Sequence, residues 1–225
     1  MFEFLHKIGF AICHQLPERT FHIHDDQMPL CSRCTGIYLG FFITIVFYFF
    51  TKFIRHKKPV IPPSLPLSII SLVFMLSMIF NAISPIFGVP TNNLARFITG
   101  ILFGFSIPLF LIPAFNFSSK AKYDDEKIIN TRNYIILLSI ICGMIIPVIT
   151  QNNLILLIFS YISIFGLILF ILLVNASLVM IVLDKVKRIK YSPYYYALLL
   201  GSTLTGVELY LFSLMHIEII EKFIN

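Results

Sequence analysis

Six long apolar segments constrain the fold of this chain more than any other feature of its sequence. They cover residues 36–54, 65–87, 94–114, 134–150, 154–183 and 194–216. A helix needs about 20 predominantly apolar residues to cross the hydrocarbon core of a bilayer. The mean hydropathy is +0.89 and only 12% of the residues are charged, about half the share found in soluble domains. We therefore predict an all-α, polytopic membrane helical bundle with about six transmembrane helices.

A short Cys/His-rich cap precedes the bundle in this prediction. Residues 1–35 would form an interfacial helix (2–12) followed by the cysteine- and histidine-bearing segment, and residues 36–225 would form the bundle, all within a single domain. The apolar residues of 2–12 leave the charged ones near one flank, as in helices that lie in the membrane interface. We recognise no removable signal peptide at this start and no internal repeat.

Basic residues predict the orientation of the bundle. Twelve of the 17 Lys and Arg residues lie in the loops 52–58, 120–132 and 185–190, which follow the first, third and fifth segments. Loops rich in Lys and Arg tend to stay in the cytoplasm. We therefore expect a multi-pass protein of the cell membrane whose N-terminus and cysteine motif are extracytoplasmic. No basic tract suggests nucleic acid as a partner, and DDEK (124–127) is expected to be a solvated loop.

Soft metal ligands gather directly before the first apolar segment. The stretch CHQLPERTFHIHDDQMPLCSRC holds three of the four cysteines. Cys31 and Cys34 form a C-x-x-C pair, a spacing that lets two thiolates face one ion. Cys13 lies upstream, with His14 beside it. Zinc favours four tetrahedral ligands drawn from Cys and His, so we predict that the three thiolates bind zinc and that His14 is the fourth ligand or lies next to it.

Three interpretations of these cysteines compete. The first is the zinc site, in either a closed structural form or a catalytic form with one open position for water. The second is a redox-active Cys31–Cys34 dithiol, which an oxidising compartment would favour. In the third, the cysteines form a structural disulfide or are inert. Cys13 next to a histidine favours zinc, because a lone C-x-x-C pair is only a moderate signal.

A second constellation, TNNLARF (91–97), opens the third apolar segment. Asn92 or Asn93 can cap the helix, and Arg96 then falls in the first turn, where a cation opposes the helix dipole. An anion would compensate, since helix N-termini and Arg both bind phosphate. We expect these three residues to bind an anionic lipid or an isoprenoid phosphate. The alternative is an arginine that snorkels to the interface. Arg19 and Arg33 are further candidates for positive charge at this site, although we expect them to be solvated or locally paired.

Further polar and small residues lie inside the apolar segments. Glu208 in the last segment is a tentative catalytic acid or base, because a carboxylate in hydrocarbon is costly; a structural ion pair or a protonated carboxyl is the alternative. Small residues four apart allow close approach of helices. Such pairs occur in the first and third segments at Gly36, Gly40, Gly100 and Gly104. These two helices are therefore expected to pack together and to bring Arg96 towards the cysteines.

Two of these motifs carry a resemblance to a known family. CHQLPERTF followed by PLCSRCTGIYLG, with TNNLARFITGILFG further along, resembles prokaryotic membrane proteins of domain-of-unknown-function family 2085. The resemblance implies a multi-pass membrane protein and brings no activity with it. An acidic residue often precedes the second motif in that family, and Asn81 stands there in this chain.

The sequence thus predicts a bilayer-embedded protein with a zinc site at the membrane surface. A metal-dependent enzyme acting on an anionic or phosphorylated lipid is the sharper hypothesis. The alternatives are a membrane thiol–disulfide oxidoreductase that uses Cys31 and Cys34, and a non-enzymatic subunit or transporter with a structural metal site. Whether the chain is an enzyme depends on whether the metal keeps an open position.

Overall fold

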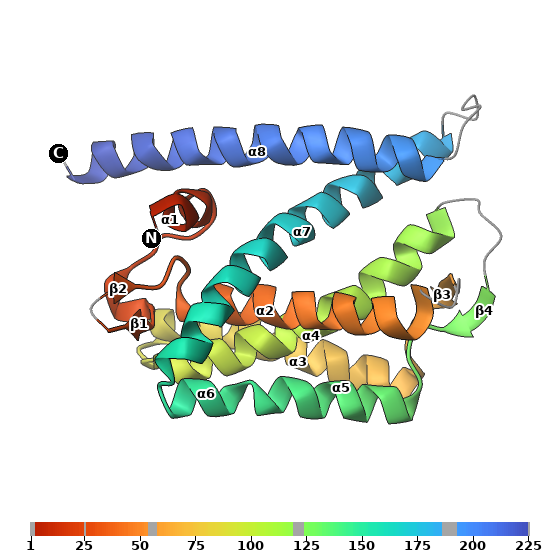
Figure 1. Cartoon of the computed structure of the whole chain (residues 1–225), viewed down its shortest axis with the longest axis horizontal. Coiled ribbons are helices and arrows are strands. Elements are labelled where there is room, and N and C mark those ends of the chain that lie inside the picture. The colour runs from red at the N-terminus through yellow and green to blue at the C-terminus, as the bar shows by residue number, and fades with distance from the viewer. Residues whose placement is uncertain (1–2, 25, 54–57, 119–123, 186–192, 225) are drawn as a thin grey trace.

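A computed structural model describes residues 3–24, 26–53, 58–118, 124–185 and 193–224 (Figure 1). Six of its helical stretches are long and apolar enough to cross a membrane. Those stretches run over Ser32–Lys52, Leu65–Phe87, Asn93–Phe117, Thr131–Ile149, Asn153–Leu183 and Tyr195–Met215. The predicted all-α membrane bundle is therefore confirmed.

The bounds of the elements follow the apolar segments closely. The helices are α1 (Glu3–Phe10), α2 (Ser32–Tyr48), α3 (Leu65–Ile83), α4 (Asn93–Ser118), α5 (Thr131–Gly143), α6 (Ile145–Ile149), α7 (Asn153–Lys185) and α8 (Pro193–Ile224). A π-helical turn, Phe49–Phe53, extends α2, and short 3-10 turns span Pro17–Arg19 and Ser84–Phe87. Two small sheets pair β1 (His22–Ile23) with β2 (Asp26–Gln27) and β3 (Pro59–Ile61) with β4 (Asp124–Lys127).

The closest helix pair is α2 with α4, and glycine makes it possible. A Cβ atom at Gly36 would lie 2.5 Å from the carbonyl oxygen of Phe97, and one at Gly100 would lie 2.5 Å from that of Arg33. Gly40 and Gly104 face backbone atoms of the opposite helix in the same way. Real side chains do not fit at such distances, so the small residues let the two backbones touch. The predicted packing of the first and third spans is confirmed.

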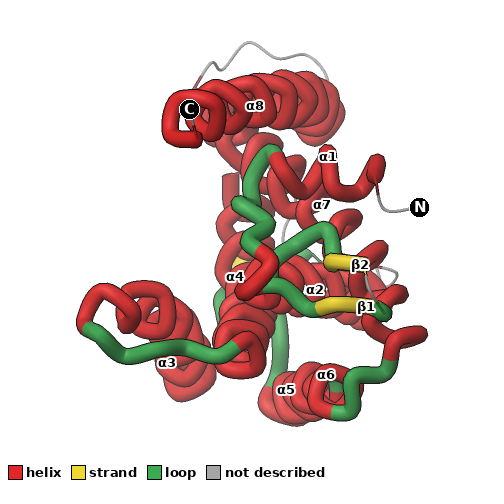
Figure 2. The backbone as a smooth tube through the Cα atoms, turned by 90° about the vertical axis from the view of Figure 1, so that its left-hand side faces the viewer, coloured by secondary structure: helices red, strands yellow, loops and turns green. Residues whose placement is uncertain are grey.

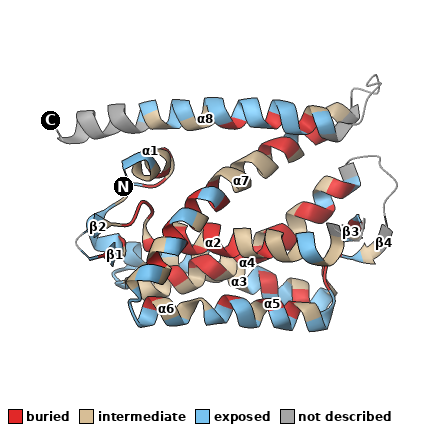
Figure 3. Cartoon of the chain, viewed as in Figure 1, coloured by how far each residue is buried: buried red, intermediate tan, exposed pale blue. Residues whose placement is uncertain are grey.

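α7 and α8 form an outer pair. α7 crosses α2 at a slant, whereas α8 contacts α7 and α1 (Figures 1 and 2). The Asn175 amide of α7 donates to Thr205 Oγ1 (3.1 Å) and to a Glu208 carboxylate oxygen (2.7 Å) of α8. Exposed residues run along α8 (Figure 3), and many are large and apolar, such as Tyr210. Hydrocarbon solvates such side chains, so this surface suits a bilayer.

Two local details differ from the expectations. The fourth span is confirmed over Thr131–Ile149, but its helix is interrupted at Met144, which divides it into α5 and α6. Pro147 explains the break, because it has no N–H to donate to the carbonyl of Gly143 and its ring crowds that oxygen. DDEK was predicted to be a solvated loop, yet β4 pairs in parallel with β3. An ion pair between Lys52 and Glu126 (3.0 Å) supports that contact.

One end of the bundle carries the functional candidates, and we call it the cysteine end. It contains the segment 11–31 and the starts of α2, α4 and α7, and the marked N- and C-terminal ends of the chain also lie there (Figure 1). Six spans that cross the membrane in alternating directions bring both ends of the chain to the same side, as this arrangement requires. Which end faces the cytoplasm stays a prediction, as does the division into residues 1–35 and 36–225. α1 is helical as expected, and it lies against α7 and α8.

Candidate metal centre

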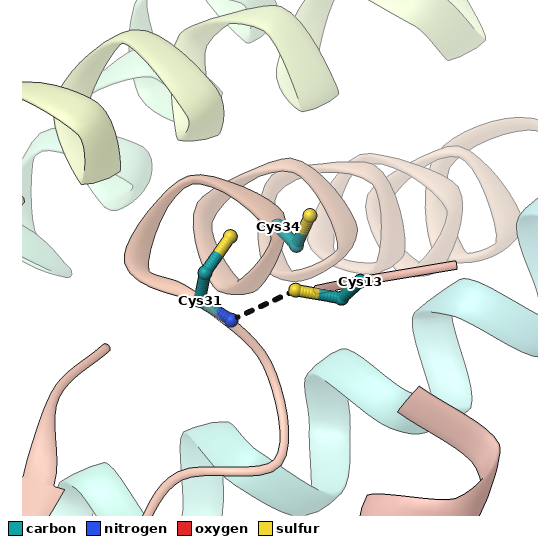
Figure 4. Close-up of side chains that lie close together, drawn as sticks. All are labelled: Cys13, Cys31 and Cys34. Atoms are coloured by element: carbon teal, nitrogen blue, oxygen red, sulfur yellow. Dashed lines mark hydrogen bonds between the residues drawn. The ribbon is translucent and has the colours of Figure 1, made fainter. Parts of the chain in front are cut away.

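Three cysteines far apart in the sequence converge at the cysteine end. The sulfur atoms of Cys13, Cys31 and Cys34 all lie within 4.8 Å of one another (Figure 4). Two sulfurs bound to one tetrahedral zinc at about 2.3 Å lie about 3.8 Å apart. The group therefore needs only a small contraction to bind a single ion. The fourth cysteine, Cys142, is exposed and belongs to α5, outside this group.

The end of α1 positions Cys13. Gly9 is buried, and a Cβ atom there would collide with the carbonyl oxygen of Pro29, so α1 can lie directly against the chain that leads into Cys31. The N–H of Cys13 then donates to the Gly9 carbonyl at 2.8 Å. Cys13 is 3% exposed, which keeps its thiol out of bulk water and directed at its two partners.

Two glutamines hold the segment between Cys13 and Cys31 in shape. The Gln15 side chain donates to the carbonyls of His6 (2.9 Å) and Pro29 (2.8 Å), while its own backbone adopts a φ of +48°. The Gln27 side chain donates to the carbonyl of Gln15 and to Thr20 Oγ1. An αL backbone at a non-glycine residue is costly and persists only when its surroundings impose it. These glutamines had no signal in the sequence, because their role depends on contacts between distant residues.

The start of α2 supplies the other two thiols. Cys31 is the N-cap residue with extended backbone angles, and Cys34 follows one turn later. The positive end of the helix dipole stabilises thiolates placed there. The N–H of Cys31 donates to the Cys13 sulfur at 3.3 Å. Both features favour negatively charged sulfur in this group.

The thiols share charge unequally. The pKa of Cys31 lies well below its usual range, because the thiols of Cys13 and then Cys34 donate hydrogen bonds to its sulfur. The same hydrogen bond with Cys31 is the main cause that raises the pKa of Cys13 to about 11. Cys31 is therefore the thiol of this group that ionises most readily, whereas Cys13 favours its protonated form. A cation that draws both sulfurs would displace the proton of Cys13.

A pocket of about 270 Å³ opens beside the sulfurs. The described residues that line it are Ile12, Cys13, His14, Gln15, Leu16, Arg19, Cys31, Arg33, Cys34 and Arg96. His14 and Arg19 are exposed, whereas the cysteines are buried or half-buried, so the thiols lie at the floor and the other two residues at the rim. His14 shares the pocket, but its ring nitrogens are outside the 4.8 Å group. Its role as a ligand stays a prediction.

Arg33 and Arg96 reach this pocket from the first turns of α2 and α4. The Arg33 guanidinium donates to the backbone oxygen (3.2 Å) and side-chain oxygen (3.0 Å) of Asn81. Arg96 Nε donates to Thr91 Oγ1 at 3.0 Å. Asn81, the residue at the position often acidic in the resembled family, thus accepts from Arg33 as a neutral group. The expectation that Arg96 lies near the cysteines agrees with the shared pocket.

Asn92 and Asn93 have different structural roles at the start of α4. Asn92 Oδ1 accepts from the N–H of Ala95 at 2.7 Å and so caps the helix. The Asn93 side chain instead accepts from Ser32 Oγ (3.3 Å) and donates to the carbonyl of Thr20 (3.4 Å). Asn93 thereby joins the starts of α4 and α2. Neither lines the pocket of the thiols among the described residues, so their anion binding stays a prediction.

Glu208 of α8 is hydrogen-bonded to α7. Its carboxylate accepts the hydrogen bond from Asn175 in the α7–α8 pair, and it is half-buried. It is outside both the sulfur group and the described lining of the pocket. Its assignment as a catalytic acid or base stays a prediction.

The chain is similar to a described protein family and to two uncharacterized archaeal proteins. The model of a family described as "Predicted membrane protein (DUF2085)" matches residues 13–110. An uncharacterized protein of Methanocaldococcus jannaschii is 30% identical over 112 residues, which are 49% of this chain and 68% of that protein. An uncharacterized protein of Methanothermobacter thermautotrophicus is 33% identical over 97 residues, 43% of this chain and 80% of that protein. No solved structure matches the chain.

Proposed function

The chain belongs to the DUF2085 family of predicted membrane proteins, and from that premise we propose that Cys13, Cys31 and Cys34 bind one zinc ion. The convergence of three sulfurs within 4.8 Å carries this proposal. Thiolates are soft ligands that suit zinc. The matched region, residues 13–110, contains all three cysteines as well as Arg33 and Arg96.

The zinc would keep one position that no cysteine fills. Catalytic zinc sites have three protein ligands and a water molecule, whereas structural sites are closed by four. His14 at the rim of the pocket is the candidate for closing the site. Without it, a zinc-bound water would face the pocket, where zinc supplies an activated water nucleophile or polarises a substrate oxygen. We propose this open form.

An anionic or phosphorylated lipid is the substrate class that fits the surroundings. Arg96 would bind the headgroup, and the apolar Ile12 and Leu16 in the pocket lining would lie next to the lipid chain. Asn92 and Asn93 would contribute indirectly: they fix the first turn of α4 and so position Arg96. Glu208 takes no part in the proposed chemistry, because its carboxylate accepts a hydrogen bond from Asn175 of α7.

A thiol–disulfide oxidoreductase is the competing function. Its specific support is the lowered pKa of Cys31 beside Cys34, the pairing that a nucleophilic thiol needs. A dithiol enzyme uses two sulfurs, however, and here a third, that of Cys13, lies within 4.8 Å of both. The third sulfur is the reason for preferring a metal.

Elemental analysis of the purified protein, with thiol counting before and after reduction, separates these functions. The proposal predicts about one zinc per chain in the wild type and in Cys142→Ser, the matched control. It predicts loss of most of that zinc in Cys13→Ser and in Cys34→Ser. A zinc-free protein that gains two thiols on reduction would contradict the proposal and favour the dithiol enzyme.

A further inference from the structure

The pocket beside the sulfurs has a one-sided charge. Three of its lining residues, Arg19, Arg33 and Arg96, are cationic, and its described lining includes no Asp or Glu. Within the described part of the chain, the ion pairs are Lys7 with Glu3 and Lys52 with Glu126, so none involves these arginines. Glu18 attracts Arg96 electrostatically, but it is not among the described residues that line the pocket. Three like charges in one pocket repel one another unless an anion joins them.

Arg33 has a buried donor without a hydrogen-bond partner among the described residues. Its two hydrogen bonds go to Asn81, a neutral residue, and its Nε atom is buried with no hydrogen-bond partner among the described residues. A buried donor left unpaired carries a desolvation penalty, which is larger for a charged group. Asn81 thus holds the guanidinium in place without neutralising its charge, and Arg33 also lines the pocket.

The helix starts add to the positive field. Ser32 and Asn93 are hydrogen-bonded (3.3 Å), so the N-terminal ends of α2 and α4 are held together. Each end carries an arginine in its first turn, Arg33 and Arg96, which opposes the helix dipole at a cost in free energy. Both helices would recover that cost if one anion bound between them.

The formal charges define the anion. Three thiolates and one Zn²⁺ together carry one negative charge, and three arginines carry three positive charges, which leaves two to be neutralised. A phosphomonoester carries about −1.5 to −2 near pH 7, whereas a phosphodiester headgroup such as phosphatidylglycerol carries only one negative charge. We propose that Arg19, Arg33 and Arg96 bind a terminal phosphomonoester and so select monoester over diester lipids. This inference rests on the proposed zinc site and names its substrate class.

Competition between two lipids with identical acyl chains tests the inference. Purified, detergent-solubilised protein is mixed with equal amounts of phosphatidic acid, a monoester, and phosphatidylglycerol, a diester, and the retained lipid is identified by native mass spectrometry. We expect the wild type to retain phosphatidic acid about tenfold or more over phosphatidylglycerol. Equal retention would overturn the inference.

Variants assign the preference to the pocket. Arg33→Gln and Arg96→Gln each remove a charge-assisted contact and should lower the affinity for phosphatidic acid about tenfold or more. Lys7→Gln removes the same charge from exposed α1 and should leave the preference unchanged. Unchanged preference in both arginine variants would contradict the inference.

Two further readouts complete the design. Inorganic phosphate at millimolar concentration tests the source of the group: retained phosphatidic acid supports a lipid ligand, and displacement by phosphate supports a soluble phosphate in the same pocket. The zinc content of every sample separates the two proposals. A zinc-free wild type contradicts the metal site, whereas zinc-loaded protein without lipid preference contradicts the monoester pocket alone. Arginine variants that keep their zinc are folded at the site.

Discussion

The backbone N–H of Cys31 donates a hydrogen bond to the sulfur of Cys13, with 3.3 Å between the two atoms. The first residue comes just before α2 and the second just after α1, so this bond joins the two halves of the cysteine group. Hydrogen bonds from backbone N–H groups stabilise thiolates and thereby favour a bound cation. The cysteine group therefore depends on this contact between Cys13 and Cys31, which the segment between the two residues must hold in place.

Gln15 is predicted to be needed for zinc binding although it offers no ligand. Gln15→Leu removes its two hydrogen bonds to the carbonyls of His6 and Pro29, at a cost of about 1–3 kcal/mol if the carbonyls stay unpaired. We expect weaker zinc binding, measured by competition with a chelator. Gln151→Leu is the matched control, since Gln151 also has a positive φ but lies in the α6–α7 turn. Equal zinc affinity in the wild type and Gln15→Leu would contradict the role of this residue.

Zinc affinity is predicted to rise with pH. The pKa of Cys13 is raised to about 11 by its hydrogen bond with Cys31, so at pH 6 to 8 zinc must displace the proton of Cys13. Each displaced proton makes the affinity increase about tenfold per pH unit. Chelator competition, corrected for the ionisation of the chelator, measures this slope. A slope of zero in this range would mean that Cys13 is not a ligand.

The contact of α2 with α4 is predicted to tolerate no added methyl group. Gly36→Ala places a Cβ atom 2.5 Å from the carbonyl oxygen of Phe97, and overpacking of this kind costs about 1–3 kcal/mol. Gly206→Ala is the control, since nothing lies within 4 Å of its Cβ position, and it should change stability by less than about 0.5 kcal/mol. Thermal unfolding in detergent compares them. Equal stability of the two variants would refute the close contact.

The bond between Asn175 and Glu208 is predicted to be structural. Asn175→Leu removes the donor and should cost about 1 kcal/mol of stability, whereas Glu208→Gln keeps an oxygen that accepts from Asn175. Both variants should retain their zinc, because neither residue lies in the sulfur group. Loss of zinc or of lipid turnover in Glu208→Gln, with stability unchanged, would instead support the catalytic role considered from the sequence.

Orientation is open to a direct labelling test. In a Cys142→Ser background, Lys7→Cys lies on exposed α1 at the cysteine end, and Lys58→Cys lies at the opposite end; both positions are exposed. The excess of Lys and Arg at the second end predicts that it faces the cytoplasm. A membrane-impermeant maleimide should label the first variant in intact cells and the second only after lysis. The reverse pattern would contradict the predicted orientation.

The helices and their main contact could be predicted because they depend on local composition. Hydropathy identified all six spans, and Gly36 and Gly104 indicated the close pair of α2 and α4. The interruption of the fourth span was not predicted. Pro147 removes one helical hydrogen bond there, but the continuous apolar run around it favours a single span. The pairing of β3 with β4 joins segments far apart in the sequence, which no local pattern reveals.

The site was predictable only in part for the same reason. Cys31 and Cys34 could be predicted because they form a C-x-x-C motif. Cys13 could be predicted as a third ligand because zinc takes four ligands and a histidine stands beside Cys13. Arg19 and Arg33 were candidates for positive charge, but they were expected to be solvated or locally paired, and the sequence did not predict that they line one pocket with Arg96. Their common surroundings arise from the fold of residues 11–31 against the starts of α2 and α4.

X-ray absorption at the zinc edge of the purified wild type tests the central claim most directly. We expect about three sulfur atoms at about 2.3 Å and one nitrogen or oxygen at about 2.0–2.2 Å around the zinc of the wild type. The zinc that Cys13→Ser still retains should have one sulfur fewer. A zinc ion surrounded only by nitrogen and oxygen, or two sulfurs in both proteins, would contradict it.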